Sequence, residues 1–504
     1  MIKEIRPKSL GLINIQDFSS INDGVLLRAK GTPHPLVCPI DWSMDPLDDR
    51  NWCFNLHAWR MMDCAIIHYE RSKDLSALEY CISIALDWYK FHLEDGRTAK
   101  FSWYDMATGL RASRLAYLLQ FARQKLVADT PQKRSKLELL ADIHAARLSD
   151  EDFISAGNHA IFQAVGLWHI GMMRSKGGTN LRKIAKKYIR DRLMLWFTDE
   201  GVHTEHSPEY HYFVLRALKN LPKGLLDKKS ANILKNANNL TNVFAGADNH
   251  VIEIGDTNMC RADGGWLPDK VEIANLSKSG YWIYRDSKSV MSVFAQACSR
   301  LHKHADDMSF TWSDRNGPLF IDSGKYGYDK DEMRSYIISA RAHNTVSIVG
   351  TTIQPSDIEL PPNGSGLLEV EELCEAVLIS GRVVRPNHFV QERELHFKPN
   401  SHVIIKDKIS GYAQNQCESI LNIDGSAELK RVSQNGWRLK RGDTEISLEA
   451  SGGEVCSFFG SREPRYGWRS RAYRNVEPCH ALSLRSVMPD RSDLQWSIRI
   501  HAMA

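Results

Sequence analysis

Hydrophobic positions recur at helical spacing over the first half of the chain. Between about residues 52 and 244, apolar side chains return every three or four positions, which is typical of helices that bury one face. The ranges with this pattern are Trp52–Tyr69, Leu75–His92, Trp103–Arg123, Lys133–Arg147, Asn158–Met173, Leu181–Phe197, Pro208–Leu221 and Ala231–Phe244. The connections between them are short, and short connections favour antiparallel neighbours. We therefore predict a domain of stacked helical hairpins.

From about Tyr281 onward the hydrophobic pattern changes to a period of two. Tyr281–Tyr284, Met291–Phe294 and His402–Ile405 are predicted as strands. The Asn-Gly pairs within residues 313–317 and 433–436 supply the positive φ angles that hairpin turns need. The second half of the chain therefore indicates an antiparallel β-sandwich.

The region between these two patterns, residues 248–279, is rich in Gly, Asp and Asn and is predicted to be a connection. The fold class is thus multidomain, with an α part followed by a β part. We expect an N-terminal segment over residues 1–45, a helical domain over 46–265 and a β-sandwich over 266–504.

Composition narrows the class of protein. The 504 residues are 43% hydrophobic and 25% charged with a net charge of +4, as in soluble globular proteins. Without a long basic run, nucleic acid is not an expected partner. No stretch is apolar enough to span a membrane, and the N-terminus lacks the pattern of a signal peptide, which predicts a cytoplasmic location. The ten cysteines are scattered without a C-x-x-C pair, which favours reduced thiols.

A candidate metal site involves three segments of the β half. His302 and His304 lie two residues apart in a stretch predicted to be extended, so their side chains would project together. Asp322 and His343 occupy later predicted strand positions. His304, Asp322 and His343 form a ligand set that suits zinc, although another divalent cation would also fit. The alternative for His302 and His304 is an alternating surface pair on a strand.

Two motifs of the helical half are candidates for catalysis. Asn158 and His159 stand at the predicted start of a helix, where the alternative role of Asn158 is to cap that helix. Further along, Ser207 followed by Pro208 is a helix-start signal, which places Tyr210 in the first turn. The helix dipole favours negative charge there, so Tyr210 could exchange a proton. The alternative is a tyrosine whose ring packs and whose hydroxyl contacts water.

Other polar residues could line a substrate cleft. His203, His206 and His211 form a loose cluster that we expect to mix cleft residues with structural histidines. A guanidinium at Arg111 or Arg341 would suit carboxylate or sulfate groups, although arginines more often pack their stems and form local ion pairs.

Seven segments together resemble the heparinase II/III family of polysaccharide lyases, which includes heparinase III and the oligoalginate lyases. In chain order they are Trp52 to Leu56, Trp103 to Arg111, Asn158-His159, Glu205 to His211, His302 to Asp306, Phe320 to Gly324 and Arg341 to Val346. Each is weak alone, but their order and spacing are specific, and they cover most of the chain between about residues 50 and 400. The final hundred residues match less clearly.

The resemblance implies an incomplete (α/α) toroid followed by the β-sandwich, and an acidic polysaccharide or oligosaccharide as substrate. It implies that Asn158 and His302 contact the substrate carboxylate and that Tyr210 handles protons. It also implies a structural zinc held by His304, Asp322 and His343. Members that degrade external polymers usually carry export signals, so the resemblance points to the cell envelope whereas the N-terminus does not.

β-Elimination beside a uronic acid explains why such residues would be needed. The reaction removes the proton at C5 and expels the oxygen at C4, so donors such as Asn158 and an imidazolium at His302 or His159 would stabilise the developing anion. Tyr210 would serve as the acid, or as both acid and base. A second phenol could come from Tyr326, Tyr328 or Tyr336.

The remaining expectations concern the substrate cleft and rival functions. The expected substrate-binding residues are His211, Arg111, Arg341, Glu205 and Tyr336. The rival functions are a glycoside hydrolase, or a glycan-handling protein without catalysis that serves capsule or exopolysaccharide production. The carboxylates available to a hydrolase are Glu200, Glu205, Glu209 and Asp105. Self-association into a homo-oligomer is compatible with the sequence.

Overall fold

The computed structural model describes residues 4–13, 17–18, 25–29, 32–262, 267–295, 298–328, 330–360, 366–385, 388–411, 415–489 and 493–502. The chain divides into two compact units. The first comprises Met1–Leu195 and Val214–Asn232, and the second comprises Trp196–Phe213 and Ile233–Ala504.

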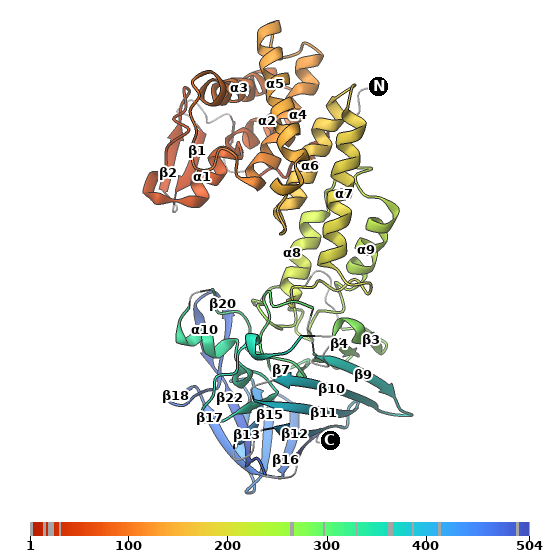
Figure 1. Ribbon diagram of the computed structural model, residues 1–504. Coiled ribbons are helices and arrows are strands. Elements are labelled where there is room, and N and C mark those ends of the chain that lie inside the picture. The colour runs from red at the N-terminus through yellow and green to blue at the C-terminus, as the bar shows by residue number, and fades with distance from the viewer. Residues whose placement is uncertain are drawn as a thin grey trace. The chain divides into compact units, whose positions relative to one another are not determined.

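The first unit is helical, with a small hairpin before the helices (Figure 1). The hairpin consists of β1 (Val25–Ala29) and β2 (Thr32–Leu36). The helices are α1 (Arg50–His57), α2 (Asp63–Ser72), α3 (Leu75–Tyr89), α4 (Asp105–Arg123), α5 (Pro131–Ser149), α6 (His159–Met173) and α7 (Gly178–Trp196). The division between the units falls inside α8 (Pro208–Leu218) and α9 (Lys228–Asn239). These elements confirm the predicted toroid-type helical part.

Two of the predicted helices differ from the observed ones by more than one helical turn. The range Trp52–Tyr69 is broken between α1 and α2, because Trp59 adopts a left-handed φ of +56° that an α-helix cannot contain. The range Ala231–Phe244 ends early, at Asn239. Residues 240–244 form turns instead, in line with the low helix propensity of the Asn238-Asn239 pair before them.

Helices α4 and α6 cross unusually closely, at two glycines. A β-carbon on Gly109 would lie 2.5 Å from the backbone carbonyl carbon of Phe162, and one on Gly166 would meet the carbonyl group of Gly109. The crossing brings the start of α4, with Asp105, beside the start of α6, with His159. The glycines thus allow a contact that any side chain would prevent.

Replacing Gly166 by alanine is expected to lower the free energy of unfolding by roughly 2–3 kcal/mol. The added methyl group meets backbone of α4, which can move away only by separating the helices. Equilibrium denaturation should detect the change. Gly157→Ala is the matched control, since a β-carbon there has only the Ser155 hydroxyl nearby, at 3.9 Å. Equal stability of the two variants would contradict the close crossing.

The second unit is an antiparallel β-sandwich, as predicted. One sheet has the strand order β17-β22-β13-β7-β6-β5-β4-β3, with β8 also paired to β13, and the other has the order β14-β15-β16-β23-β12-β11-β10-β9. Phe310 and Leu319 of the first sheet and Leu395 and Ile405 of the second belong to one buried cluster between them. Alternating burial along β11 and β12 explains the sequence period of two.

The strand bounds are as follows. The first sheet contains β3 (Glu272–Leu276), β4 (Tyr281–Arg285), β5 (Ser289–Phe294), β6 (Ser309–Asp314), β7 (Gly317–Phe320), β8 (Val346–Ile348), β13 (Gln416–Ile423), β17 (Glu454–Phe459) and β22 (His480–Val487). The second contains β9 (Leu367–Glu372), β10 (Val377–Arg385), β11 (Phe389–Lys398), β12 (His402–Gly411), β14 (Glu428–Arg431), β15 (Gly436–Arg441), β16 (Thr444–Ser451) and β23 (Leu494–Ala502). Two small hairpins are β18 (Ser461–Arg462) with β19 (Arg465–Tyr466), and β20 (Trp468–Ala472) with β21 (Asn475–Pro478). Helix α10 spans Glu332–Ile337.

The predicted strands are confirmed, and the two Asn-Gly pairs lie where β6 meets β7 and where β14 meets β15. The expected positive φ is present at Gly317, with +115°, but not at Asn435 or Gly436, because Gly436 is already the first residue of β15. The predicted connection over residues 248–279 is wrong in part, because β3 pairs with β4 as a regular strand. The segment from His302 to Phe310 was expected to be extended, but β6 begins only at Ser309. Lys303 pairs with both Asp306 and Asp307, three and four residues ahead, and this local pairing requires a turn.

The compact units also differ from the predicted domain boundary at residue 265. Residues of the segments 196–213 and 233–262 pack onto the first strands of the sandwich. Val202, Tyr212, Phe244 and Ile254 share a buried cluster with Tyr281 and other strand residues. This packing assigns both segments to the second unit.

Candidate functional site

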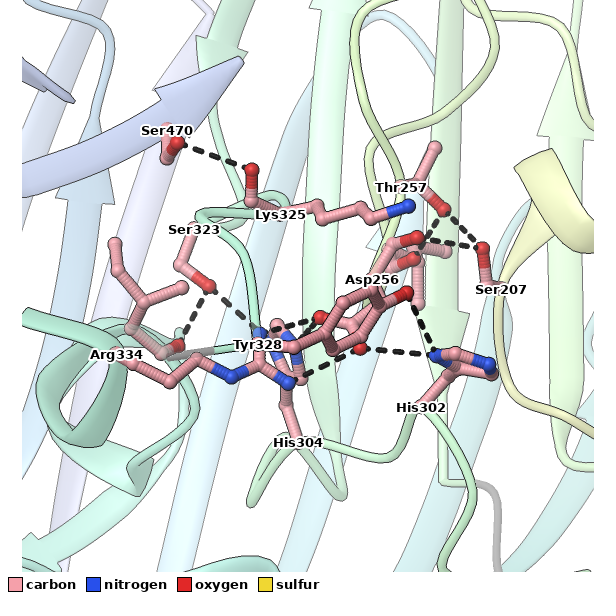
Figure 2. A network of polar contacts seen from close by, with 12 residues as sticks. Ser207, Asp256, Thr257, His302, His304, Ser323, Lys325, Tyr328, Arg334 and Ser470 are labelled. Atoms are coloured by element: carbon pink, nitrogen blue, oxygen red, sulfur yellow. Dashed lines mark hydrogen bonds and ion pairs between the residues drawn. The ribbon is translucent and has the colours of Figure 1, made fainter. Parts of the chain in front are cut away.

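The first turn of α8 holds Tyr210, and a loop of the sandwich anchors this turn. The Tyr210 amide donates to the Ser207 hydroxyl at 3.3 Å, so Ser207 caps the helix at its predicted start. The same hydroxyl lies 2.8 Å from that of Thr257 (Figure 2). The start of α8 is thereby tied to the loop that contains Asp256.

Tyr210, His302 and Tyr328 form one contact group. The Tyr210 and His302 rings stack with centroids 3.9 Å apart and an interplanar angle of 22°. The Tyr210 hydroxyl lies 2.6 Å from the Tyr328 hydroxyl, which is also 3.4 Å from Nδ1 of His302. The ammonium of Lys325 lies over both phenol rings, 5.1 and 5.3 Å from their centroids. Two phenols, an imidazole and an ammonium therefore converge on one place.

Asp256 holds the surroundings of this group together. Its carboxylate accepts from Nδ1 of His302 and Nε2 of His304, each at 3.0 Å, and from both terminal nitrogens of Arg334 at 2.5 and 3.0 Å (Figure 2). Burial alone would raise the pKa of Asp256, but the hydrogen bonds from His302, His304 and Arg334 hold it well below its ordinary value. An ionised Asp256 thus fixes the orientation of both imidazoles.

Glu205 stands on the other side of His302. Its Oε2 lies 3.5 Å from Nε2 of the imidazole, and its side chain is 22% exposed. Burial raises the pKa of Glu205 above its ordinary value, while the charge of His302 acts in the opposite direction. Of the expected substrate-binding residues, Glu205 is the one that the structure places in this contact group.

His304, Asp322 and His343 form the expected cluster. One ligand atom from each lies within 4.8 Å of the others, and all three side chains are buried. Nδ1 of His343 lies 2.9 Å from Oδ2 of Asp322, while Nε2 of His343 and Oδ1 of Asp322 have no hydrogen-bond partner among the described residues. Unpaired buried polar atoms are costly, and a cation bound between them would remove that cost. The donor set fits zinc.

The elements that supply this cluster differ from the prediction. His304 lies in the loop before β6, Asp322 just after β7 and His343 just before β8, so none of the three lies within a strand. Side-chain direction here is set by loop contacts rather than by strand alternation. The Asp256 carboxylate, and not a shared strand face, brings His302 and His304 together.

Asn158 and His159 belong to the first unit. Asn158 is half-buried and makes no capping hydrogen bond, which removes the capping alternative. Nδ1 of His159 lies 3.1 Å from both oxygens of Asp105, and its ring is 5.7 Å from that of Tyr104. Burial would raise the pKa of Asp105, but the hydrogen bond from His159 brings it below its ordinary value.

The structure corrects the expectation for Arg111. This side chain is 0% exposed and lies in the core of the first unit. Its guanidinium donates to Nε2 of His144 at 2.8 Å and to the carbonyls of His57 and Ser102 at 2.6 and 2.8 Å. Because these donors are engaged inside the protein, Arg111 has a structural role here and offers nothing to a glycan.

Arg341, Tyr336 and His211 are also occupied inside the second unit. Arg341 donates to the carbonyl of Thr351 and lies 3.6 Å from the buried Glu418. The Tyr336 hydroxyl, 3.4 Å from the Trp468 amide, sits on a side chain that is 4% exposed. Burial lowers the pKa of His211 to about 4, so its imidazole is neutral at pH 7. Tyr336 and His211 are buried, and the half-buried Arg341 is held by Thr351 and Glu418.

The other histidines and acids of the expected cleft have local partners too. His203 is buried, which lowers its pKa to about 3, and Nε2 of His206 accepts from the Ser299 amide at 2.9 Å. Glu200 accepts from the Ser279 hydroxyl at 2.5 Å, and Glu209 accepts from the Asn258 amide at 2.8 Å. These contacts give the two glutamates structural partners.

Sequence reasoning missed Asp256, Arg334 and Lys325. Asp256 follows a glycine in a stretch of turn-forming residues, which gave no signal beyond a loop. Lys325 does follow the recognised Asp322-Ser323-Gly324 segment directly, and that proximity could have drawn attention to it. Among the described residues, no helix is long and apolar enough to cross a membrane.

Comparison with known proteins gives one consistent result. The family model described as heparinase II/III N-terminus matches residues 33–248, and that described as heparinase II/III-like, C-terminal, matches residues 268–497. Heparan sulfate lyase HepC from Pedobacter heparinus superposes with a TM-score of 0.75 at 15% identity, over 95% of this chain and 81% of that one. A heparinase III-BT4657 gene product gives 0.73 at 16% identity, over 100% and 85%. At such identities these structures show a common fold. No curated protein matches the chain by sequence.

Proposed function

The chain belongs to the heparinase II/III family, and from that premise we propose that it is a polysaccharide lyase acting on an acidic, uronate-containing polysaccharide or oligosaccharide by β-elimination. The observation that carries the proposal is the Tyr210 phenol, stacked on His302 at 3.9 Å with its hydroxyl 2.6 Å from that of Tyr328. An acid–base pair of phenols beside cations suits proton removal and return next to a carboxylate.

Tyr328 is the best candidate for the second phenol. Its hydroxyl reaches that of Tyr210, whereas Tyr336 is buried and Tyr326 packs against Tyr336 and Ile337. Burial, together with the hydrogen bond to Tyr210, raises the pKa of Tyr328 above its ordinary value, so this hydroxyl keeps its proton at neutral pH. We assign it the donor role: the Tyr328 hydroxyl donates to the Tyr210 oxygen and stabilises the phenolate form of Tyr210. That phenolate takes the C5 proton and becomes neutral, and it can then return the proton to the leaving oxygen at C4.

Positive charge near the two phenols would stabilise the anion that develops on the substrate. Lys325 lies over both rings, and Arg334 lies 5.7 Å from the Tyr328 centroid. His302, held by Asp256 and flanked by Glu205, presents a fixed imidazole beside the reacting oxygen. Preorganised donors of this kind contribute several kcal/mol to anion stabilisation. We propose His302 as a contact of the sugar carboxylate.

His304, Asp322 and His343 would hold a divalent cation, for which zinc is the best match. Bound there, the ion would serve as a structural cross-link between the loops before β6, after β7 and before β8. His304 also donates to Asp256 at 3.0 Å, so its orientation bears on that of His302. The acid–base roles stay with the protein's own phenols.

The test of the proposed reaction is direct. Purified protein is incubated with heparan sulfate, alginate and other uronate polymers while ultraviolet absorbance and reducing ends are followed. Elimination creates a C4=C5 double bond, so both signals should rise together. Reducing ends without the absorbance would mean hydrolysis, and neither signal with measurable binding would mean a glycan-handling protein without catalysis. Either outcome would refute the lyase.

Asn158→Ala is expected to lower kcat/KM by roughly a hundredfold, as loss of one preorganised anion donor does. The amide, which makes no capping bond, would contact the substrate carboxylate in this proposal. Asn158→Ala should keep the melting temperature of the parent. The control is Asn238→Ala, at a side chain that donates to the Leu234 carbonyl of its own helix at 2.7 Å. Unchanged kinetics in Asn158→Ala would remove Asn158 from the mechanism.

A further inference from the structure

The β20–β21 hairpin supports both loops of the candidate site, although it lies in the final hundred residues, which sequence left unassigned. The Ser470 amide donates to the Ser323 carbonyl at 2.8 Å, and the Arg474 amide donates to the Tyr326 carbonyl at 2.7 Å. On the other side, the Met259 amide donates to the Arg471 carbonyl at 3.0 Å. Figure 2 shows Ser470 joined to Lys325. The hairpin therefore fixes the loops that carry Tyr328 and Asp256.

The tip of this hairpin presents an exposed aromatic ring beside the site. Tyr473 is 60% exposed and Tyr328 is 53% exposed. The Tyr473 ring packs against the backbone of Gly327, where a β-carbon would lie only 3.1 Å from its Cε2. Gly327 immediately precedes Tyr328 in the chain. The exposed Tyr473 ring thus packs against the backbone position directly before Tyr328, where a side chain would meet the ring.

Arg474, the second residue of the tip, has a strained backbone. Its φ is +55°, the left-handed conformation that glycine and asparagine adopt at lower cost. Its guanidinium lies over the Tyr473 ring, 5.7 Å from the centroid. A long cationic side chain thus occupies a turn position where glycine would relieve the strain. Retained strain of this kind is a reason to look for a function of the side chain.

We propose that Tyr473 and Arg474 form a further sugar-binding subsite, next to the group around Tyr210, for a second acidic sugar of the same substrate. The Tyr473 ring packs against the apolar face of the sugar, and the Arg474 guanidinium pairs with its carboxylate or sulfate. The subsite rests on the proposed function, since it assumes an acidic glycan, but it concerns binding and not elimination. It selects for chain length and charge.

The test measures binding of hexasaccharides from heparan sulfate and from alginate, with neutral cellohexaose for comparison. All variants carry Tyr210→Phe, so that turnover does not interfere. Tyr473→Ala should weaken binding of the acidic probe about tenfold, whereas Tyr473→Phe, which keeps the ring, should bind like the parent. Phe459→Ala is the matched control, because Phe459 is an aromatic side chain of the same unit and 53% exposed.

Arg474→Gly tests the charged contact without the strain. Glycine suits the observed φ, so the variant should melt no lower than the parent. Its binding of the acidic probe should nevertheless fall about tenfold and depend less on salt. The subsite would be overturned if Tyr473→Ala and Arg474→Gly both bound the acidic probe as tightly as the parent does. It would also be overturned if the parent bound neither acidic hexasaccharide. Loss of binding in these variants without elimination by the native chain would instead refute the lyase and leave the subsite standing.

Discussion

Tyr210→Phe is expected to lower kcat for elimination by roughly a thousandfold, the size of effect that follows loss of a general acid–base group. The substitution removes only the hydroxyl that lies 2.6 Å from Tyr328. Phenylalanine keeps the ring that stacks on His302. The hydrogen bond that is lost, between the Tyr210 and Tyr328 hydroxyls, is exposed to solvent. We therefore expect the melting temperature to change little, since such a bond contributes about 1 kcal/mol.

Initial rates on the most active uronate polymer, together with circular dichroism and a thermal melt, would check this expectation. Tyr188→Phe is the matched control, because it removes a hydroxyl that donates to the Ser149 carbonyl at 3.1 Å within the first unit. Tyr188→Phe should keep the native kcat. A Tyr210→Phe enzyme with native kcat would exclude Tyr210 from proton transfer, and Tyr328→Phe would then show whether the other phenol acts alone.

Asp322→Asn is expected to abolish most metal binding and to lower the melting temperature by roughly 5 °C or more. The amide is a poorer ligand than the carboxylate, and it removes the negative charge that lies 2.9 Å from Nδ1 of His343. His304→Ala should likewise lower metal content and thermal stability together. Elemental analysis of the purified protein, and melts with and without a chelator, measure both effects.

A second buried aspartate separates metal loss from general destabilisation. Asp424 is 2% exposed and pairs with Arg441 and Arg469, each at 2.8 Å, outside the His304 cluster. Asp424→Asn should therefore melt at a lower temperature and still retain its metal. Native protein that contains no divalent ion, and whose melting temperature responds neither to zinc nor to a chelator, would falsify the metal site.

Local patterns of the sequence were enough for most elements of the fold. Helix α3 and strands β4 and β5 lie where periodicity predicts them, because one-sided burial imposes its spacing directly on the sequence. The turn between β6 and β7 depends on the conformational freedom of Gly317, whose φ is +115°. Where a tertiary contact overrides such local preferences, as at the left-handed Trp59, the predicted helix is interrupted.

The candidate site was predicted only in part. The order and spacing of the motifs pointed to Tyr210 and His302, whose rings stack in the structure. They also pointed to His304, Asp322 and His343, which form one buried cluster. The strand geometry invoked for His302 and His304 was wrong, since the buried pairing of Lys303 with Asp306 and Asp307 folds that segment into turns. The sequence therefore predicted which residues belong to the site, but not the backbone conformation that positions His302 and His304.

By itself the sequence determined the order of the α and β parts, the family and the residue types available for acid–base and metal chemistry. The tertiary structure alone decided which polar side chains are accessible. It encloses Arg111 completely, places Asp256 between two imidazoles and Arg334, and brings Tyr473 against Gly327. The physical reason is that burial and electrostatic pairing depend on neighbours far apart along the chain, whereas helical and strand periodicity depend on neighbours within a few residues.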